Sequence, residues 1–591
     1  MRLNRSKCAR AGGVYIAVLG TALMVSVLAM SSLVLQRVQN RQLSATTDMR
    51  QAQLNAETAV ELGMLILQDE SNWRTARTHG RWFTGRSSGA VATGTCSLDV
   101  LDTLDSNLAD DDYEPVVLVG IGNQGQAEQR IKVTIDPLKQ PLDCLKSAVA
   151  AGDLIDLQSD TLRSNGLITA SQVAANSSSI YGKVEAVTIS GSTYNGTTTQ
   201  VTASQRPDMP DWSTAFDYYH TNATTISIND LPSVTPNLGR NTSFDANADY
   251  WTGAGIGLPT ATITRETNIA GHAACLRVHN RSAMTAGASQ YIDTFVKPGV
   301  SYNFSLQIYV TSSWGNAFRI KLSTKGTAAA QTNASSLLVV LQDGDWHDVS
   351  GTVTAPAWSG NLEYARLTID TDAPGSDNSF YIDNLTIGEN TTGRFIYRRV
   401  LSPGVNPFGS GTTNAQGIYK IDCGGQRLII ERSRISGTLL VINPGANSCV
   451  GDGPIHWAPF VAGYPALLVD ADVAANADFS IRATNRALNE KENGVNYNPA
   501  GSSHADLGQD ADTIDIYRSQ ITGLIAIEDD LTFQNTPLIR GQIIVGDDIA
   551  NSSGALDVEY QPDSLLNPPP GFLAPKSYAR RAGSSTKAVL P

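Results

Sequence analysis

The chain has 591 residues, of which only 17% are charged and 51 are glycine. This length exceeds what one hydrophobic core can serve and predicts about four domains of ordinary size. The net charge of −13 argues against nucleic acid as a partner, because binding to phosphates needs clustered cations. The composition favours an extracellular, mainly β protein over a cytosolic enzyme.

The N-terminal region contains a long uncharged stretch. Ala11 to Leu35 carries no charged side chain, and basic residues stand on both sides of it. A helix of this length can cross the hydrocarbon core of a bilayer. Because more Arg and Lys precede the stretch than follow it, we expect a cytoplasmic N-terminus. The prediction is a single-pass protein of a bacterial inner membrane, with a periplasmic or cell-surface body. A cleaved signal peptide is the alternative.

The helix-forming pattern continues beyond the apolar stretch. Residues 38–68 lack proline and carry a loose apolar stripe. One long helix, apolar first and amphipathic later, resembles the stem of a type IV pilin or of a type II secretion pseudopilin, including PilX-like and K-type minor members. Residues 10–15 look like a prepilin cleavage site, with the bond after Gly12 or, between Gly13 and Val14, after Gly13. The resemblance implies other pilin or pseudopilin subunits as partners. The usual Glu at the fifth mature position is missing, so a plain anchor with a helical stalk stays open.

A small head is predicted next. Residues 113–122 and 129–135 read as two strands around a Gly-Asn-Gln-Gly turn. With the helix assigned to residues 1–70, residues 71–147 would form a pilin-like α+β head.

A short repeat marks much of the remaining chain. The sequence of 430–441 matches that of 516–527, its core recurs at 539–545, and a related version lies at 180–187. Short strands separated by glycine turns at this period favour a β-solenoid, with an ordinary β-sandwich as the alternative. We expect a first solenoid-like part with a linker over 148–236, a second part over 391–562, and a disordered tail over 563–591.

The segment between the two parts has its own landmarks. Residues 241–245 read Asn-Thr-Ser-Phe-Asp, 271–278 read Gly-His-Ala-Ala-Cys-Leu-Arg-Val, and 380–387 read Phe-Tyr-Ile-Asp-Asn-Leu-Thr-Ile. In this order they resemble the family 4/9 (CenC-like) carbohydrate-binding modules, which are galactose-binding-like jelly-roll sandwiches. The resemblance implies an inserted module over 237–390 with a polysaccharide or glycan as its partner.

Strand alternation within this module suggests binding residues. In residues 302–310, aliphatic and aromatic positions alternate with polar ones. The polar face is free to meet sugars, which stack on rings and need amide and guanidinium partners. A solvated face without a ligand is the alternative. The predicted carbohydrate-binding residues are Gln290, Gln307, Tyr309, Trp314 and Arg319.

The sequence contains one pair of acids at which we expect a metal ion. Asp245 and Asp383 fall in the first and last expected strands of the module, which are neighbours in a jelly roll. The family resemblance implies a structural Ca²⁺ there, completed by backbone oxygens. Two surface carboxylates near turns are the alternative.

No motif singles out catalytic residues. The seven His are scattered, without an H-E-x-x-H pattern, and no carboxylate pair stands out as a glycosidase would need. The sequence therefore predicts a membrane-anchored, surface-displayed carbohydrate-binding protein of the minor pilin or pseudopilin type, used in adhesion or polysaccharide capture. The alternatives are a structural minor pilin whose sandwich binds protein, and a glycoside hydrolase acting on polysaccharide.

Overall fold

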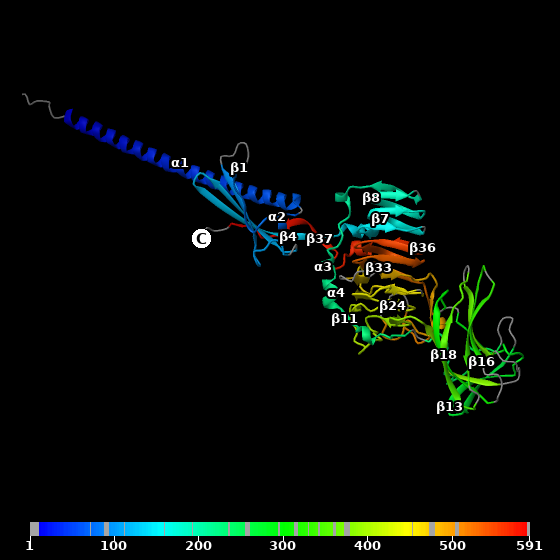
Figure 1. Cartoon of the computed structure of the whole chain (residues 1–591). Coiled ribbons are helices and arrows are strands. Elements are labelled where there is room, and N and C mark those ends of the chain that lie inside the picture. Colours follow the sequence, from blue (N-terminus) through cyan, green and yellow to red (C-terminus); the bar gives the residue numbers. More distant parts are fainter. Residues whose placement is uncertain are drawn as a thin grey trace, which may run out of the picture. The chain divides into compact units, whose positions relative to one another are not determined.

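The computed structural model describes residues 11–587 with the exception of 71, 88–93, 111–112, 159, 192, 235–236, 254–259, 293–295, 312–316, 329, 341–342, 359–361, 372–378, 452, 472–478 and 503–507. The chain forms two compact units, one of residues 1–141 with 573–591 and one of residues 142–572. The first unit combines one long N-terminal helix with an antiparallel sheet, and the second consists mainly of strands (Figure 1). The expectation of a mainly β protein with such a helix is confirmed.

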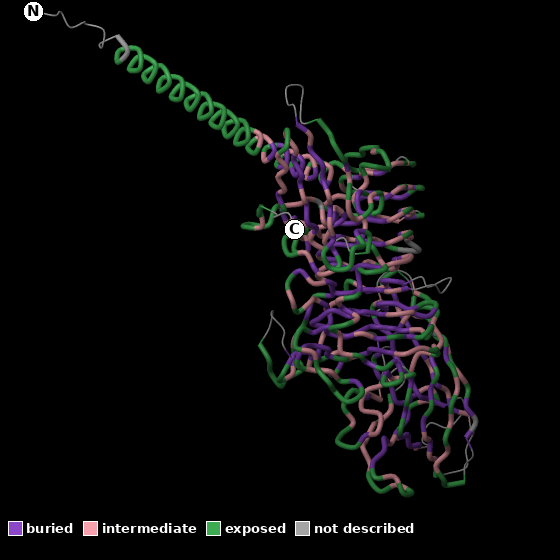
Figure 2. Tube along the Cα trace, turned by 90° about the vertical axis from the view of Figure 1, so that its left-hand side faces the viewer, coloured by how far each residue is buried: buried purple, intermediate pink, exposed green. Residues whose placement is uncertain are grey.

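The long helix α1 (Ala11–Asp69) has two different halves. The N-terminal half exposes its apolar side chains, whereas the second half is buried along one face (Figure 2). An 18-residue window of this helix has a mean hydropathy of 2.2. By length and composition alone, α1 is therefore suited to cross a membrane.

A six-stranded antiparallel sheet packs against the second half of α1. The approach is close because β3 carries two glycines: a Cβ at Gly122 would lie 2.0 Å from the carbonyl oxygen of Ala52, and one at Gly120 would lie 2.2 Å from that of Ala56. The elements of this unit are α2 (Trp73–Ala76), β1 (Gly80–Ser87), β2 (Thr95–Asp102), β3 (Val116–Gln124), β4 (Ala127–Pro141), β37 (Leu573–Arg580) and β38 (Thr586–Lys587).

A disordered tail was expected over 563–591, but residues 563–587 contain α6 (Asp563–Leu566), β37 and β38. β37 pairs antiparallel with β4 along most of its length. The Trp73 indole donates a hydrogen bond to the Tyr578 hydroxyl at 3.1 Å, and the Arg581 guanidinium lowers the pKa of Asp136. The prolines at 568–570 thus precede a strand, β37, that pairs with β4. Local composition could not predict this strand, because its partner is distant in sequence.

Most of the second unit is a stack of parallel strands. From β21 onward, a strand generally pairs with the one three places later, as in β21–β24–β27–β30 and β23–β26–β29. Each strand buries aliphatic side chains against the strands above and below, and these residues form one continuous core. The strands are β21 (Arg394–Tyr397), β22 (Val400–Leu401), β23 (Ile418–Asp422), β24 (Leu428–Glu431), β25 (Arg434–Ser436), β26 (Thr438–Ile442), β27 (Cys449–Val450), β28 (His456–Ala458), β29 (Pro465–Asp470), β30 (Phe479–Ile481), β33 (Gln520–Ile527), β34 (Leu531–Asn535), β35 (Leu538–Val545) and β36 (Ile549–Tyr560).

The N-terminal strands of this unit extend the C-terminal end of the stack. β5 (Ser147–Ala151) pairs with β35, while β6 (Leu154–Asp156) and β7 (Thr161–Ala175) pair with β36. Residues 201–231 then return through α3 (Trp212–Ala215) and α4 (Asp217–Asn222) to β11 (Thr224–Thr225), which pairs with β23 at the other end. The module therefore follows β11 and precedes β21 at one end of the stack, while β5, β6 and β7 lie at the other end. The remaining elements are β8 (Ser179–Gly191), β9 (Tyr194–Asn195), β10 (Thr198–Gln200), β31 (Leu488–Asn489), α5 (Glu490–Asn493), β32 (Ile516–Tyr517) and α6 (Asp563–Leu566).

The expected β-sandwich is present between the return segment and β21. Its five-stranded sheet has the order β12–β13–β20–β15–β18 and its four-stranded sheet the order β14–β19–β16–β17. One apolar core fills the space between them. The strands are β12 (Thr262–Ile269), β13 (His272–His279), β14 (Ala288–Tyr291), β15 (Ser301–Val310), β16 (Ala317–Gly326), β17 (Thr332–Val339), β18 (Trp346–Thr354), β19 (Leu362–Thr371) and β20 (Phe380–Glu389).

We expect Gly541→Ala to destabilise the stack. Gly541 pairs in register with Gly523, and a Cβ on it would lie 2.1 Å from the Gly523 carbonyl oxygen. Backbone must therefore shift, at a cost of about 1–3 kcal/mol. Hydrogen exchange of the β33 and β35 amides measures the change. Gly508→Ala is the control, because a Cβ there meets nothing within 4 Å. Equal exchange in both variants would contradict the close-approach argument.

We expect removal of residues 573–591 to expose the edge of β4. The deletion removes the strand that pairs with β4 and the Tyr578 ring that meets Trp73 at 5.6 Å. Amides of residues 135, 136 and 138–140 should then exchange faster with solvent, and Trp73 fluorescence should shift to longer wavelength. Unchanged exchange in the truncated protein would show that β37 does not stabilise this sheet.

Candidate functional site

The predicted carbohydrate-binding residues do not lie together. The alternation expected in β15 is confirmed, since Phe304, Leu306, Ile308 and Val310 are all buried in the core. Gln307 and Tyr309 consequently point from the outer face of the five-stranded sheet. Arg319 belongs to the four-stranded sheet and points from the opposite outer face of the sandwich. Trp314 lies outside the described residues.

Gln290 is a structural residue, contrary to the prediction. Its side chain is 1% exposed. Its Oε1 accepts from the Arg240 backbone N–H at 2.7 Å, and its Nε2 donates to the Arg240 carbonyl oxygen at 2.8 Å. Both ends of the amide are thus used to attach the entry segment of the module to β14, which leaves neither for a ligand.

Several side chains on the outer face of the five-stranded sheet contact one another, although Arg277 Nε on β13 is buried without a hydrogen-bond partner among the described residues. The Tyr309 ring lies 5.4 Å from Trp346 and 5.5 Å from Tyr381, with the neighbouring planes tilted by 32° and 63°. Gln307 Oε1 accepts from the Asn384 amide at 2.7 Å. These rings pack on each other at differing angles and do not offer one flat surface for stacking.

The two acids of the calcium expectation already have protein partners. Asp383 Oδ2 lies 2.6 Å from His272 Nδ1, and its Oδ1 accepts from the Asn384 backbone N–H at 2.8 Å. Asp245 Oδ2 accepts from the Ser243 hydroxyl at 2.7 Å. Burial raises the pKa of Asp383, with the Asp245 carboxylate adding to the rise. Calcium prefers several free oxygen ligands, and this set does not fit it.

The outer face of the four-stranded sheet is different, because several of its buried polar groups lack partners among the residues that the structure describes. Asp370, fully buried, accepts from Arg319 Nε at 2.9 Å and from Lys321 Nζ at 3.2 Å. One carboxylate therefore serves two cations. Arg319, the one predicted residue on this face, holds Asp370 in place.

Arg366 stands at the centre of that face. Its neighbours Ala365 and Leu367 are in the core, so alternation directs Arg366 outward. The side chain is fully buried, yet none of its three guanidinium nitrogens has a hydrogen-bond acceptor among the residues that the structure describes. The hydroxyls of Ser323 and Thr368 are equally buried and equally lack a partner within the described chain. We call Ser323, Arg366 and Thr368 the Arg366 cluster.

Two tyrosines adjoin the Arg366 cluster. Tyr291 is paired directly with Arg366 across β14 and β19, and it is 41% exposed. The Tyr364 ring lies 6.0 Å from the Arg366 guanidinium carbon and 6.2 Å from the Tyr291 ring. An exposed ring beside a buried guanidinium joins the two chemistries that sugar recognition requires. Sequence reasoning missed these residues, although the alternation from 364 to 370 marks them.

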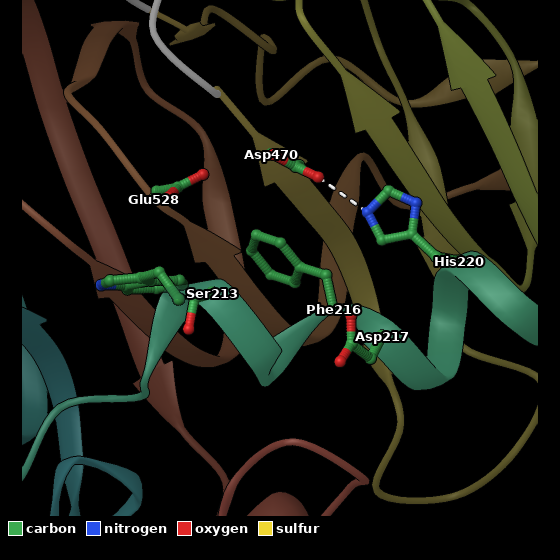
Figure 3. A pocket seen from close by; sticks show the side chains of 7 residues that line it. Ser213, Phe216, Asp217, His220, Asp470 and Glu528 are labelled. Carbon is green, nitrogen blue, oxygen red and sulfur yellow. Dashed lines mark hydrogen bonds and ion pairs between the residues drawn. The ribbon is translucent and has the colours of Figure 1, made fainter. Parts of the chain in front are cut away.

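A cavity of about 360 Å³ lies in the second unit, between the stack and residues 212–220 of α3 and α4 (Figure 3). His220 Nε2 on α4 lies 2.7 Å from Asp470 Oδ2 at the end of β29. Glu528 accepts a hydrogen bond from the Ala471 backbone N–H at 3.2 Å. Asp470 thus contacts α4 through His220, and Glu528 contacts the backbone at Ala471. We assign neither acid a catalytic role.

Comparison with known proteins bears on the sandwich alone. A family model for a carbohydrate binding domain (families 4 and 9) matches residues 236–376. This match confirms the resemblance to carbohydrate-binding modules that the sequence predicted. No curated protein matches the chain.

Similar solved structures include several carbohydrate-binding modules. The CBM22-2 xylan-binding domain from Paenibacillus barcinonensis is 18% identical over 26% of this chain and 99% of its own, with a TM-score of 0.22. The C-terminal family 22 module of a Clostridium thermocellum protein is 22% identical over 26% of this chain and 92% of its own, with a TM-score of 0.21. A family 16 carbohydrate binding module is 20% identical over 26% and 99%, with a TM-score of 0.20.

We expect calcium to leave the sandwich unchanged. A cation that binds only the folded state raises the unfolding temperature with its concentration, but here His272, Asn384 and Ser243 occupy carboxylate oxygens of Asp383 and Asp245. Scanning calorimetry in EDTA and in rising Ca²⁺ should give the same transition temperature within about 1 °C. A transition that rises with the logarithm of calcium concentration, and loses that rise in Asp383→Asn, would restore the calcium site.

Proposed function

We propose that the sandwich binds a polysaccharide through the outer face of its four-stranded sheet. The observation that carries this proposal is the Arg366 cluster. Leaving a buried charge without a partner costs several kcal/mol, and a ligand that supplies acceptors offsets that cost. The adjoining Tyr291 ring provides a stacking surface for a sugar. The match of residues 236–376 to a carbohydrate binding domain supports the same chemistry.

We further propose that the module is displayed outside the cell on a membrane anchor. The exposed apolar half of α1 and its hydropathy support an anchor in a bacterial inner membrane. A long helix with a small antiparallel sheet on its second half supports a pilin-like or pseudopilin-like assembly role. The parallel pairing of coil upon coil supports a β-solenoid that carries the module. Adhesion or polysaccharide capture is the function that unites these parts.

We expect Arg366→Met to weaken glycan binding while it stabilises the sandwich. Methionine fills a similar volume and buries no charge, whereas Arg366 has no hydrogen-bond acceptor among the described residues, so the unfolding temperature should rise. Lost charge-assisted hydrogen bonds should weaken glycan affinity by about tenfold or more. A glycan array followed by calorimetry on the best polysaccharide measures both effects. A lower unfolding temperature would mean that Arg366 serves the fold rather than a ligand.

Two tyrosine variants separate the faces of the sandwich. Tyr291→Ala removes the exposed ring beside Arg366 and should weaken binding by about 3–10-fold. Tyr309→Ala changes the outer face of the five-stranded sheet and should leave affinity unaltered. The opposite result, with affinity lost only in Tyr309→Ala, would move the binding site to the five-stranded sheet.

A further inference from the structure

The charges on the outer face of the four-stranded sheet indicate the class of glycan. Arg319, Lys321 and Arg366 are cationic, and Asp370 is the acid that the first two share. Lys325, farther along β16, is paired with Glu363 and adds no net charge. Among the described side chains, the face therefore has an excess of positive charge, although the chain as a whole carries −13.

We infer that the sandwich selects an anionic polysaccharide, whose sugar-borne carboxylate or sulfate group pairs with Arg366. This inference rests on the proposed function and names the ligand class of the same site. The chemistry that recommends it is the planar fork of a guanidinium, which matches the two oxygens of an oxyanion.

A neutral glycan satisfies the Arg366 cluster less well. Sugar hydroxyls can accept from the guanidinium, but such bonds are roughly half as strong as those to an ionised acceptor. They also leave the buried positive charge uncompensated, which is the larger cost. An oxyanion forms stronger hydrogen bonds with the guanidinium and also compensates its charge. Its remaining lone pairs can accept from the Ser323 and Thr368 hydroxyls, which lack other partners among the described residues.

The neighbouring residues fit a charged sugar in more than one way. Tyr291 is paired with Arg366 across the strands, so a sugar ring stacked on Tyr291 places a ring substituent next to the guanidinium. Lys321 is paired with Thr368, the next outward position along β19. Its ammonium shares Asp370 with Arg319 and adds to the positive potential that attracts an acidic chain.

The test compares charged and neutral forms of the same polymers. The full chain in detergent micelles is titrated with a panel in which each acidic polysaccharide stands beside its carboxyl-reduced form and the sulfated derivative of that form. We expect the best charged member to bind about tenfold or more tightly than its reduced form, with a preference that falls as salt rises. The carboxylate and sulfate members together show which oxyanion is preferred.

Variants tie the preference to this face. Arg366→Gln should reduce the acid preference to about threefold or less, and Lys321→Gln, at a partly exposed side chain, should reduce it by a smaller factor. Lys491→Gln on α5 is exposed and removes the same charge, so it should keep the full preference. Equal loss in all three variants would reduce the effect to net charge and overturn the inference.

The outcomes separate the inference from the proposed function. Tightest binding to a neutral member, abolished by Arg366→Gln, would overturn the anionic class and leave carbohydrate binding at this face intact. Binding to no member of the panel or of the glycan array would overturn both.

Discussion

The alternation of side chains along each strand determines which residues enter the cores of the sandwich and the stack and which point outward. In β19, Ala365, Leu367 and Ile369 enter the core between the sheets, which forces Arg366 and Asp370 to the outer face. The strand cannot move one of these sets without moving the other. The same rule directs the aliphatic residues of the parallel stack inward, where one core runs from β21 to β8. The positions of the candidate-site residues on the outer face therefore follow from the positions of their neighbours in the core.

The outward-pointing side chains have different surroundings on the two outer faces of the sandwich. On the five-stranded sheet, rings contact rings, and Asp383 and Gln307 have partners inside the protein. On the four-stranded sheet, the Arg366 cluster keeps buried polar groups without partners among the described residues. Groups that pair within the protein contribute stability, whereas buried polar groups without partners cost stability. This contrast, more than the number of aromatic residues, distinguishes the faces.

Local pattern predicted part of this structure and topology decided the rest. The core positions of β15 and the glycine repeats of β33 and β35 follow from period and composition, because they depend on neighbours in sequence. Sheet membership does not: β15 and β16 are consecutive, yet they belong to different sheets, which separates Tyr309 from Arg319. The order of residues 573–580 was equally hidden, since β37 depends on β4, more than 400 residues earlier.

Long-range pairing also decides where the module joins the stack. Its two ends are direct neighbours, since the Leu238 N–H donates to the Ile387 carbonyl oxygen at 2.8 Å. The chain leaves after β11 and re-enters at β21, while β5, β6 and β7 continue the coils of β35 and β36. No parallel pairing among these strands is interrupted by the sandwich. The stack and the module therefore have separate apolar cores, and polar contacts such as that of Lys297 Nζ with Glu431 Oε2 at 3.4 Å connect them.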